Sequence, residues 1–133
     1  MNSLPQRQAQ AIEQLNALPT WYDRYNHLIK LANTLPPMPA GLLLSKNRVG
    51  GCQSVTYIAT EVREGKFYLH GQSNAHIPKG IIAFAHGIFN GCTLEELKAT
   101  AVNFHTQTGL ATELTAGRQN FLINLVNRIC NAK

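Results

Sequence analysis

The chain has 133 residues, of which 44% are hydrophobic and 14% are charged, a balance typical of one globular domain rather than of a disordered segment. Its formal net charge of +5 favours an acidic partner, yet the basic residues form no run and do not interleave with aromatic ones, so we expect no nucleic-acid binding. No apolar stretch approaches the roughly 20 residues that cross a bilayer. Because the N-terminus also lacks the apolar core of a signal peptide, we expect a cytoplasmic protein without a membrane anchor.

The first third of the chain is predicted to be helical. A short helix is expected over residues 6–18. Apolar residues then recur at helical spacing from Trp21 onward, which predicts an amphipathic helix over 21–33 with Thr20 as its N-cap. The prolines of 35–39 end this helix and favour an extended segment.

The middle of the chain has the pattern of a β-hairpin. Residues 55–60 alternate as in a strand with one buried face, and 67–71 form the returning strand. The turn at 63–66 is short and contains a glycine, so the two strands are expected to pair antiparallel.

The remainder is predicted to be mainly helical. Ser73-Asn74 is a candidate N-cap, and Thr93 begins a capping-box pattern. The expected helical segments are 75–89, 94–103, a short stretch within 104–115 that Gly109 interrupts, and 117–130 with Thr115 as its N-cap. The order of elements predicts a single α+β domain over residues 1–133, in which a small antiparallel sheet of two to three strands packs against several helices.

The stretch Gly50-Gly51-Cys52-Gln53-Ser54 is the strongest candidate for chemistry. A thiol that follows two glycines and precedes a strand is expected at the tip of a loop, where it can reach another molecule. The alternative is a small buried residue at the start of the strand, since free cysteines are often buried. Lys46 and Arg48, or the N-terminus of the helix after Asn74, are candidates to lower the pKa of this thiol.

Two other kinds of cysteine site stay open on the residues alone. Three cysteines without a CxxC pair do not predict a disulfide framework, but Cys52, Cys92 and Cys130 with a histidine are a possible metal site. A cysteine hydrolase would instead need a histidine beside Cys52, and the candidates are His70 and His76, which flank the end of the second strand. The simpler interpretation is that Cys92 and Cys130 are packing residues and that the histidines have no special role.

Arg118 lies at the start of the last predicted helix, where the helix dipole favours an anion. A cation at this position indicates an acidic partner, a contact with the cysteine loop, or an ordinary solvated arginine.

Four segments, in this order, resemble the SufE/CsdE family of sulfur-acceptor proteins. They are Arg24–Ala32 with Leu35-Pro36, Asn47–Ser54, Gly71–Ala75 with Lys79-Gly80-Ile81, and Leu110–Thr115 with Arg118–Leu122. The second segment resembles the loop that carries the family's acceptor cysteine, which corresponds to Cys52. The likeness extends from about Trp21 to the C-terminus.

The resemblance implies an α+β fold related to that of iron–sulfur scaffolds and a role as a sulfur carrier. Cys52 would accept persulfide sulfur from a SufS/CsdA-type cysteine desulfurase, activate that enzyme, and pass the sulfur to an iron–sulfur scaffold or another acceptor. The pyridoxal phosphate belongs to the desulfurase, so this chain is expected to bind no cofactor. We expect a monomer that acts as an accessory sulfur-transfer protein rather than as a free-standing enzyme.

The same resemblance implies which residues support the loop or meet the partner. They are Gly50, Gly51, Gln53, Ser54, Ser73, Asn74, Lys79 and Arg118. Three positions depart from the family pattern, because Asn74 stands where an acidic residue is usual, Thr56-Tyr57 replaces Val-Trp, and Phe121 replaces Gly. These departures leave open whether the chain serves iron–sulfur assembly or tRNA modification.

Overall fold

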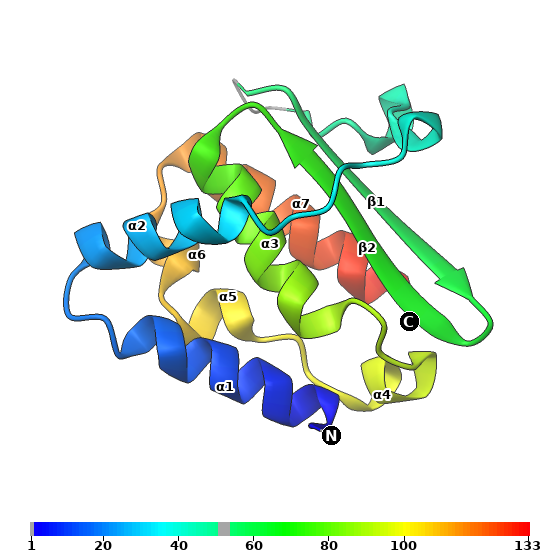
Figure 1. Ribbon diagram of the computed structural model, residues 1–133, viewed down its shortest axis with the longest axis horizontal. Helices are drawn as coiled ribbons and strands as arrows, with labels where there is room; N and C mark the ends of the chain where they lie inside the picture. Colours follow the sequence, from blue (N-terminus) through cyan, green and yellow to red (C-terminus); the bar gives the residue numbers. More distant parts are fainter. Residues whose placement is uncertain (1, 51–53) are drawn as a thin grey trace.

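The computed structural model describes residues 2–50 and 54–133. In sequence order, a β-hairpin follows two N-terminal helices and precedes a longer helical C-terminal half, and in space it lies along one side of the molecule (Figure 1). The helices are α1 (Leu4–Asn16), α2 (Trp21–Ala32), α3 (His76–Phe89), α4 (Leu94–Ala99), α5 (Phe104–Gln107), α6 (Leu110–Glu113) and α7 (Ala116–Asn131). Two short 3₁₀ helices, Ala40–Leu42 and Ser45–Asn47, precede the strands β1 (Thr56–Arg63) and β2 (Lys66–Ser73). The predicted α+β fold with a small antiparallel sheet is therefore confirmed.

Helix α3 lies at the centre of the molecule, with the hairpin and α7 on one side and α1 and α2 on the other (Figure 1). Most of its surface is buried, as expected for a helix packed against several elements, while His76 and Gly87 are exposed. The buried residues are Ile77, Pro78, Gly80, Ile81, Ile82, Ala83, Phe84, Ala85, Ile88 and Phe89. The approach of α2 is so close that a Cβ on Gly80 would lie 2.2 Å from the carbonyl oxygen of Leu28. A Cβ on Gly71 of β2 would likewise lie 2.5 Å from Cγ2 of Ile82. Both glycines are thus required by close packing around α3.

The hairpin pairs Thr56 with Ser73 at its open end and Arg63 with Lys66 at its turn. The turn residues Glu64 and Gly65 have φ values of 52° and 76°, in the left-handed region that a tight two-residue turn needs. The predicted turn at 63–66 is confirmed, and both strands are longer than expected. Val55 is 39% exposed and precedes β1 rather than beginning it.

Several predicted helix boundaries agree with the structure. The Thr20 hydroxyl accepts a hydrogen bond from the Asp23 N–H at the start of α2, and the capping box at Thr93 is formed at the start of α4. Gly109, at a φ of 80°, separates α5 from α6. Helix α7 begins after Thr115, although the threonine side chain makes no capping hydrogen bond. None of the described helices is both long enough and apolar enough to cross a membrane.

The helix predicted over 94–103 is wrong in its second half, because α4 ends at Ala99. The backbone of the following residues bonds to α1 instead of continuing the helix. The Gln8 side chain donates to the carbonyl of Ala101, and its Oε1 accepts from the N–H groups of Asn103 and Phe104. This contact is about 95 residues distant in sequence, which is why local helical spacing did not reveal it.

The predicted cap of α3 is also wrong. The N-cap residue is Ala75, and neither Ser73 nor Asn74 caps the helix from that position. Ser73 Oγ accepts from the Ala75 N–H, one residue before the helix, while the Asn74 side chain bonds to Val55. Both polar residues therefore connect the hairpin to the start of α3.

Candidate functional site

The base of the candidate cysteine loop is closed by backbone pairing. The Val49 N–H donates to the Thr56 carbonyl oxygen at 2.9 Å, and Arg48 pairs with Tyr57 in an antiparallel bridge. These pairings bring together the two ends of segment 50–55. Cys52, Gly51 and Gln53 lie outside the described residues, so the site is built from the residues that flank them.

Asn74 joins the C-terminal side of the loop to the start of α3. Its Oδ1 accepts from the Val55 N–H at 2.9 Å, and its own N–H donates to the Val55 carbonyl oxygen at 3.2 Å. Asn74 thus serves Val55 as a strand partner would, one residue beyond the last regular pair of the sheet. The first turn of α3 consequently lies beside the residue that leads into β1.

A row of hydroxyl groups runs beneath this junction. Ser54 Oγ lies 2.8 Å from Thr56 Oγ1, which lies 2.8 Å from Ser73 Oγ, and Ser73 Oγ accepts from the Ala75 N–H at 3.1 Å. Thr56 is fully buried and Ser73 is 9% exposed. Hydrogen bonds between buried hydroxyl groups fix the side-chain rotamers, so Ser54 is held in register with the hairpin.

The last helix supports the other side of the loop. The Asn120 side chain in α7 donates from Nδ2 to the Gly50 carbonyl oxygen at 2.9 Å. Arg118, two residues earlier on α7, is half-buried near Tyr25 of α2. Burial raises the pKa of the Tyr25 hydroxyl, the Glu113 charge raises it further, and the Arg118 charge opposes both. The Arg118 charge is therefore close enough to Tyr25 of α2 to affect its pKa, and among the described hydrogen bonds of α7 it is that of Asn120 which reaches the loop.

Arg128 connects three elements below the loop, and sequence reasoning missed it. Its guanidinium donates from Nη1 to the Ile58 carbonyl at 2.8 Å, from Nη2 to the Lys46 carbonyl at 3.1 Å, and from Nε to Asn124 Oδ1 at 2.7 Å. Partial burial lowers the pKa of Arg128. The spacing of Asn124 and Arg128 by four residues was the only signal in the sequence, and such pairs are common on solvated helices.

Basic residues surround this end of the molecule. Lys46 and Arg48 are exposed, and Lys79 lies partly exposed in the first turn of α3. The sequence contains no aspartate or glutamate from residue 24 to residue 60. The surface that carries the loop is therefore suited to an acidic partner.

The comparisons with known proteins assign the chain to a family. A family model described as "SufE: Fe-S metabolism associated domain" matches residues 9–132. The chain belongs to the SufE family. The match thus extends beyond the four segments that resemble the family and covers nearly the whole sequence.

Relatives within and beyond the bacteria have sequences similar to this one. The chain is 33% identical over 125 residues to an uncharacterised SufE-like protein of Rhizobium meliloti, covering 90% of this chain and 89% of that protein. It is 31% identical over 117 residues to the sulfur acceptor protein CsdE of Escherichia coli, covering 86% and 80%. It is 35% identical over 112 residues to the cysteine desulfuration protein SufE of Plasmodium vivax, covering 81% of this chain and 44% of that protein.

A solved structure has the same fold. The solution structure of a hypothetical protein from Thermus thermophilus matches with a TM-score of 0.73 and 25% sequence identity, covering 96% of both chains.

The two described cysteines of this SufE-family chain lie apart from the loop base. Cys92 is 1% exposed, and its carbonyl oxygen accepts from the Phe67 N–H near the turn of the hairpin, roughly 20 Å along the strands from Thr56. Burial raises the pKa of its thiol, with a smaller increase from Glu96 and a decrease from Arg7. Cys130 lies half-buried near the end of α7. Among the described residues, no cluster of three or more histidine, cysteine or acidic side chains is arranged to hold a metal.

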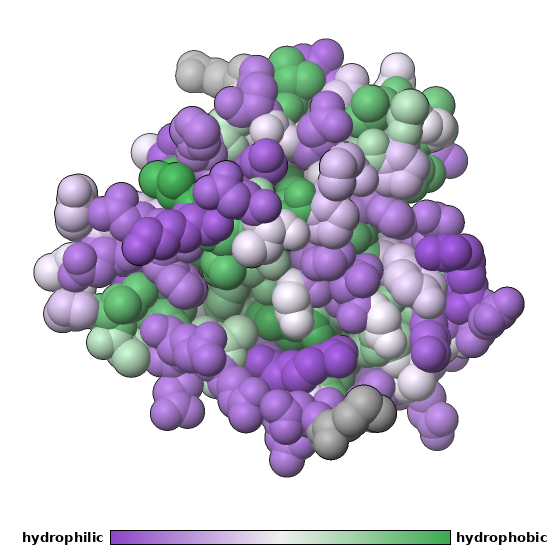
Figure 2. Space-filling view, in the orientation of Figure 1, coloured by the Kyte–Doolittle hydropathy of each residue, from purple (hydrophilic) through white to green (hydrophobic). Residues whose placement is uncertain are grey.

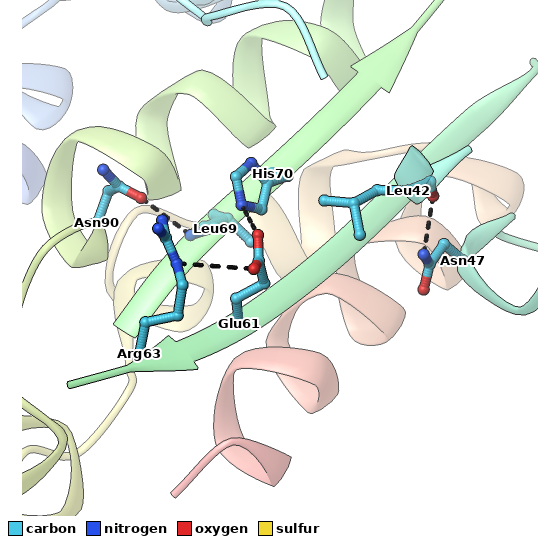
Figure 3. Close-up of polar contacts among 7 residues, drawn as sticks. All are labelled: Leu42, Asn47, Glu61, Arg63, Leu69, His70 and Asn90. Carbon is cyan, nitrogen blue, oxygen red and sulfur yellow. Dashed lines mark hydrogen bonds and ion pairs between the residues drawn. The ribbon is translucent and has the colours of Figure 1, made fainter. Parts of the chain in front are cut away.

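The two candidate histidines have different positions. His70 Nε2 lies 2.6 Å from Oε1 of Glu61, whose Oε2 lies 3.6 Å from Nε of Arg63, as Figure 3 shows on the surface of the hairpin. His70 is paired across the sheet with Ala59, roughly 10 Å along the strand from Ser73. His76 is exposed as the first residue of α3. The described contacts of His70 are therefore within the hairpin rather than at the loop base.

Proposed function

We propose that this protein is a sulfur acceptor in which Cys52 takes sulfur from the persulfide of a cysteine desulfurase. The observation that carries the proposal is the SufE-family match over residues 9–132, which includes the glycine-flanked cysteine. Two of its relatives are named for this chemistry, as a sulfur acceptor protein and a cysteine desulfuration protein. The proposed acceptor role is consistent with a loop whose two ends are bonded to β1, α3 and α7.

The transfer step is a thiol–disulfide type of exchange. The Cys52 thiolate attacks the outer sulfur of the desulfurase persulfide, and a new sulfur–sulfur bond forms on Cys52 as the bond to the desulfurase cysteine breaks. The desulfurase cysteine leaves as a thiolate and can take up the proton that Cys52 lost. No electrons are gained or lost overall. The pyridoxal phosphate that releases sulfur from cysteine is held by the desulfurase, so the step requires no cofactor on this chain.

The residues around the loop have supporting roles in this proposal. Asn74 and Asn120 hold the residues on either side of the cysteine segment, which fixes the two points between which that segment runs. Lys46, Arg48, Lys79 and Arg118 provide the positive surface for an acidic face of the desulfurase. The second transfer would pass the outer sulfur from Cys52 to an iron–sulfur scaffold or another thiol acceptor in the cytoplasm.

The test uses a cysteine desulfurase and cysteine labelled with ³⁵S. After mixing and separation without reductant, we expect label on the wild-type chain that dithiothreitol removes, and none on the Cys52→Ser variant. The Cys92→Ser and Cys130→Ser variants are the matched controls and should be labelled as the wild type is. Labelling of Cys52→Ser, or its loss in either control alone, would contradict the proposal.

Activation of the desulfurase is a separate measurement. Because removal of the persulfide frees the enzyme for another turnover, wild-type protein should raise the rate of alanine formation, and Cys52→Ser should not. Equal stimulation by both proteins would show that any activation is independent of sulfur acceptance.

A further inference from the structure

A groove on the face opposite the hairpin is formed by α1, α2 and the exposed side of α3. Its volume is about 370 Å³, within the usual range for small-molecule sites. Figure 2 shows this face, where hydrophobic side chains are visible in a hollow between hydrophilic ridges. The groove is lined by Asn2, Arg7, Gln10, Ala11, Gln14, His27, Leu31, Ala83, Phe84 and Gly87.

The polar groups of this groove favour an anion. Among the described residues that line the groove, Arg7 carries a positive charge, His27 is the other basic residue, and none is acidic. Three amide side chains add neutral donors at the rim, although the Asn2 amide already donates to Gln10 Oε1 at 2.9 Å. The apolar floor between these groups is suited to a short hydrocarbon rather than to a highly charged ligand.

Arg7 has unused hydrogen-bonding capacity on one edge. Its Nε and Nη2 atoms are buried without a hydrogen-bond partner, and no ion pair within 4.0 Å to Arg7 is found among the described residues. The charge of Arg7 lowers the pKa of the nearby Glu96, but the described hydrogen bonds of that carboxylate come from the Leu4 N–H and from Thr93 and not from Arg7. Buried donors without partners are costly, so a rotation of the Arg7 side chain that brings them to an acceptor in the groove relieves that cost.

The geometry of this edge matches one chemical group. Nε–H and one Nη2–H of a guanidinium are parallel, at the spacing of the two oxygens of a carboxylate. Turning this edge into the groove breaks no hydrogen bond, since neither atom has one to lose. We propose that the groove binds a small monocarboxylate with a short apolar tail, with the carboxylate on Arg7 and the tail over Ala83 and Phe84.

The proposal can be tested with hexanoate as the probe, by NMR titration of ¹⁵N-labelled protein at low ionic strength. We expect saturable shifts of the amides of Ala11, Ala83 and Gly87, and none of comparable size with hexanamide or inorganic phosphate. Arg7→Gln should weaken hexanoate binding about tenfold or more, because it removes the charged donor pair. Lys30→Gln removes a positive charge from an exposed site on α2 and should leave the affinity within about twofold.

A second variant tests the groove without changing Arg7. A Cβ on Gly87 meets no atom within 4 Å, so Gly87→Leu can place a side chain on the groove wall without strain in the helix. It should abolish hexanoate binding in a protein that unfolds as cooperatively as the wild type. The proposal is overturned if hexanamide binds as well as hexanoate, if neither Arg7→Gln nor Gly87→Leu weakens binding, or if the shifts fall outside the groove.

Discussion

Asn74 shows how a single side chain can extend a sheet beyond its last backbone pair. The side-chain oxygen of Asn74 accepts from the Val55 N–H, and the backbone N–H of Asn74 donates to the Val55 carbonyl. Val55, which leads into β1, is thus held in place although it has no partner in the β1–β2 ladder. The family pattern has an acidic residue here, and a carboxylate oxygen can accept the same hydrogen bond. The departure from the family pattern is therefore compatible with an unchanged local structure.

This account of Asn74 predicts different results for two substitutions. Asn74→Ala should lower the free energy of unfolding by about 1 kcal/mol, since an exposed hydrogen bond is lost, while Asn74→Asp should stay close to wild type. Urea denaturation measures the first effect, and hydrogen exchange of the Val55 amide should be faster in Asn74→Ala alone. Faster exchange in both variants would mean that the amide group itself, and not its oxygen, is needed.

Glu96 is a second residue whose contacts give a prediction, in this case for pH. The N–H groups of Thr93 and Leu4 lower the pKa of Glu96 most, and the Thr93 hydroxyl and the Arg7 charge lower it further against the effect of burial. A carboxyl group with a lowered pKa in the folded state adds stability above its unfolded pKa and loses that contribution as the pH falls through the folded value.

The stability difference between wild type and Glu96→Gln should therefore be fully present near pH 7, at about 1 kcal/mol, and should decline as the pH falls below the ordinary glutamate pKa of about 4.3. Glutamine retains one acceptor for the capping box, so Glu96→Ala should be the less stable variant at neutral pH. Chemical denaturation at several pH values measures this dependence. A difference that is constant from pH 3 to pH 7 would show that the charge of Glu96 is not involved.

At the scale of elements, the packing of α3 depends on the positions of its glycines. Gly80 allows the backbone of α2 to approach at Leu28, and Gly87, two turns later, faces open space. The two glycines lie in one helix but have opposite requirements.

Alanine substitutions at these positions should have effects of opposite sign. Gly80→Ala forces a Cβ against a backbone carbonyl and should destabilise the protein by about 3 kcal/mol. The Cβ of Gly87→Ala enters open space, so this change should stabilise the protein by roughly 0.5–1 kcal/mol, because glycine is a poor helix former. Thermal unfolding of both variants gives the comparison, and destabilisation by Gly87→Ala would place an unrecognised neighbour over that residue.

For the molecule as a whole, Arg128 connects the sheet, the segment before the loop and the last helix. Replacement by lysine keeps the charge but can satisfy at most one or two of the three acceptors. Arg128→Lys should therefore lower the free energy of unfolding by about 2 kcal/mol, as measured by urea denaturation. Arg118→Lys on the same helix is the matched control, and an equal loss in both would refute a special role for Arg128.

The fold was largely predictable because most of its elements carry local signals. Three of these signals depend only on residues close together in the sequence: the helical spacing from Trp21, the capping box at Thr93 and the glycine of the hairpin turn. The errors arose where a distant partner decided the conformation, as when Gln8 takes the backbone bonds of residues 101–104. For the site, the sequence indicated the loop and its neighbours Ser73 and Asn74, but not the contacts of Asn120 and Arg128, which come from a helix folded back over the hairpin.

The support that α7 gives to the loop has a consequence for biosynthesis. Asn120 and Arg128 follow their partners Gly50 and Ile58 by 70 residues, so they leave the ribosome after the loop and the hairpin do. A nascent chain can form the hairpin before these residues emerge, but it then lacks the bonds to Gly50, Lys46 and Ile58. Both sides of the thiol-bearing segment are therefore bonded only after α7 has been synthesised, so a chain that terminates before α7 would lack the contacts of Asn120 and Arg128.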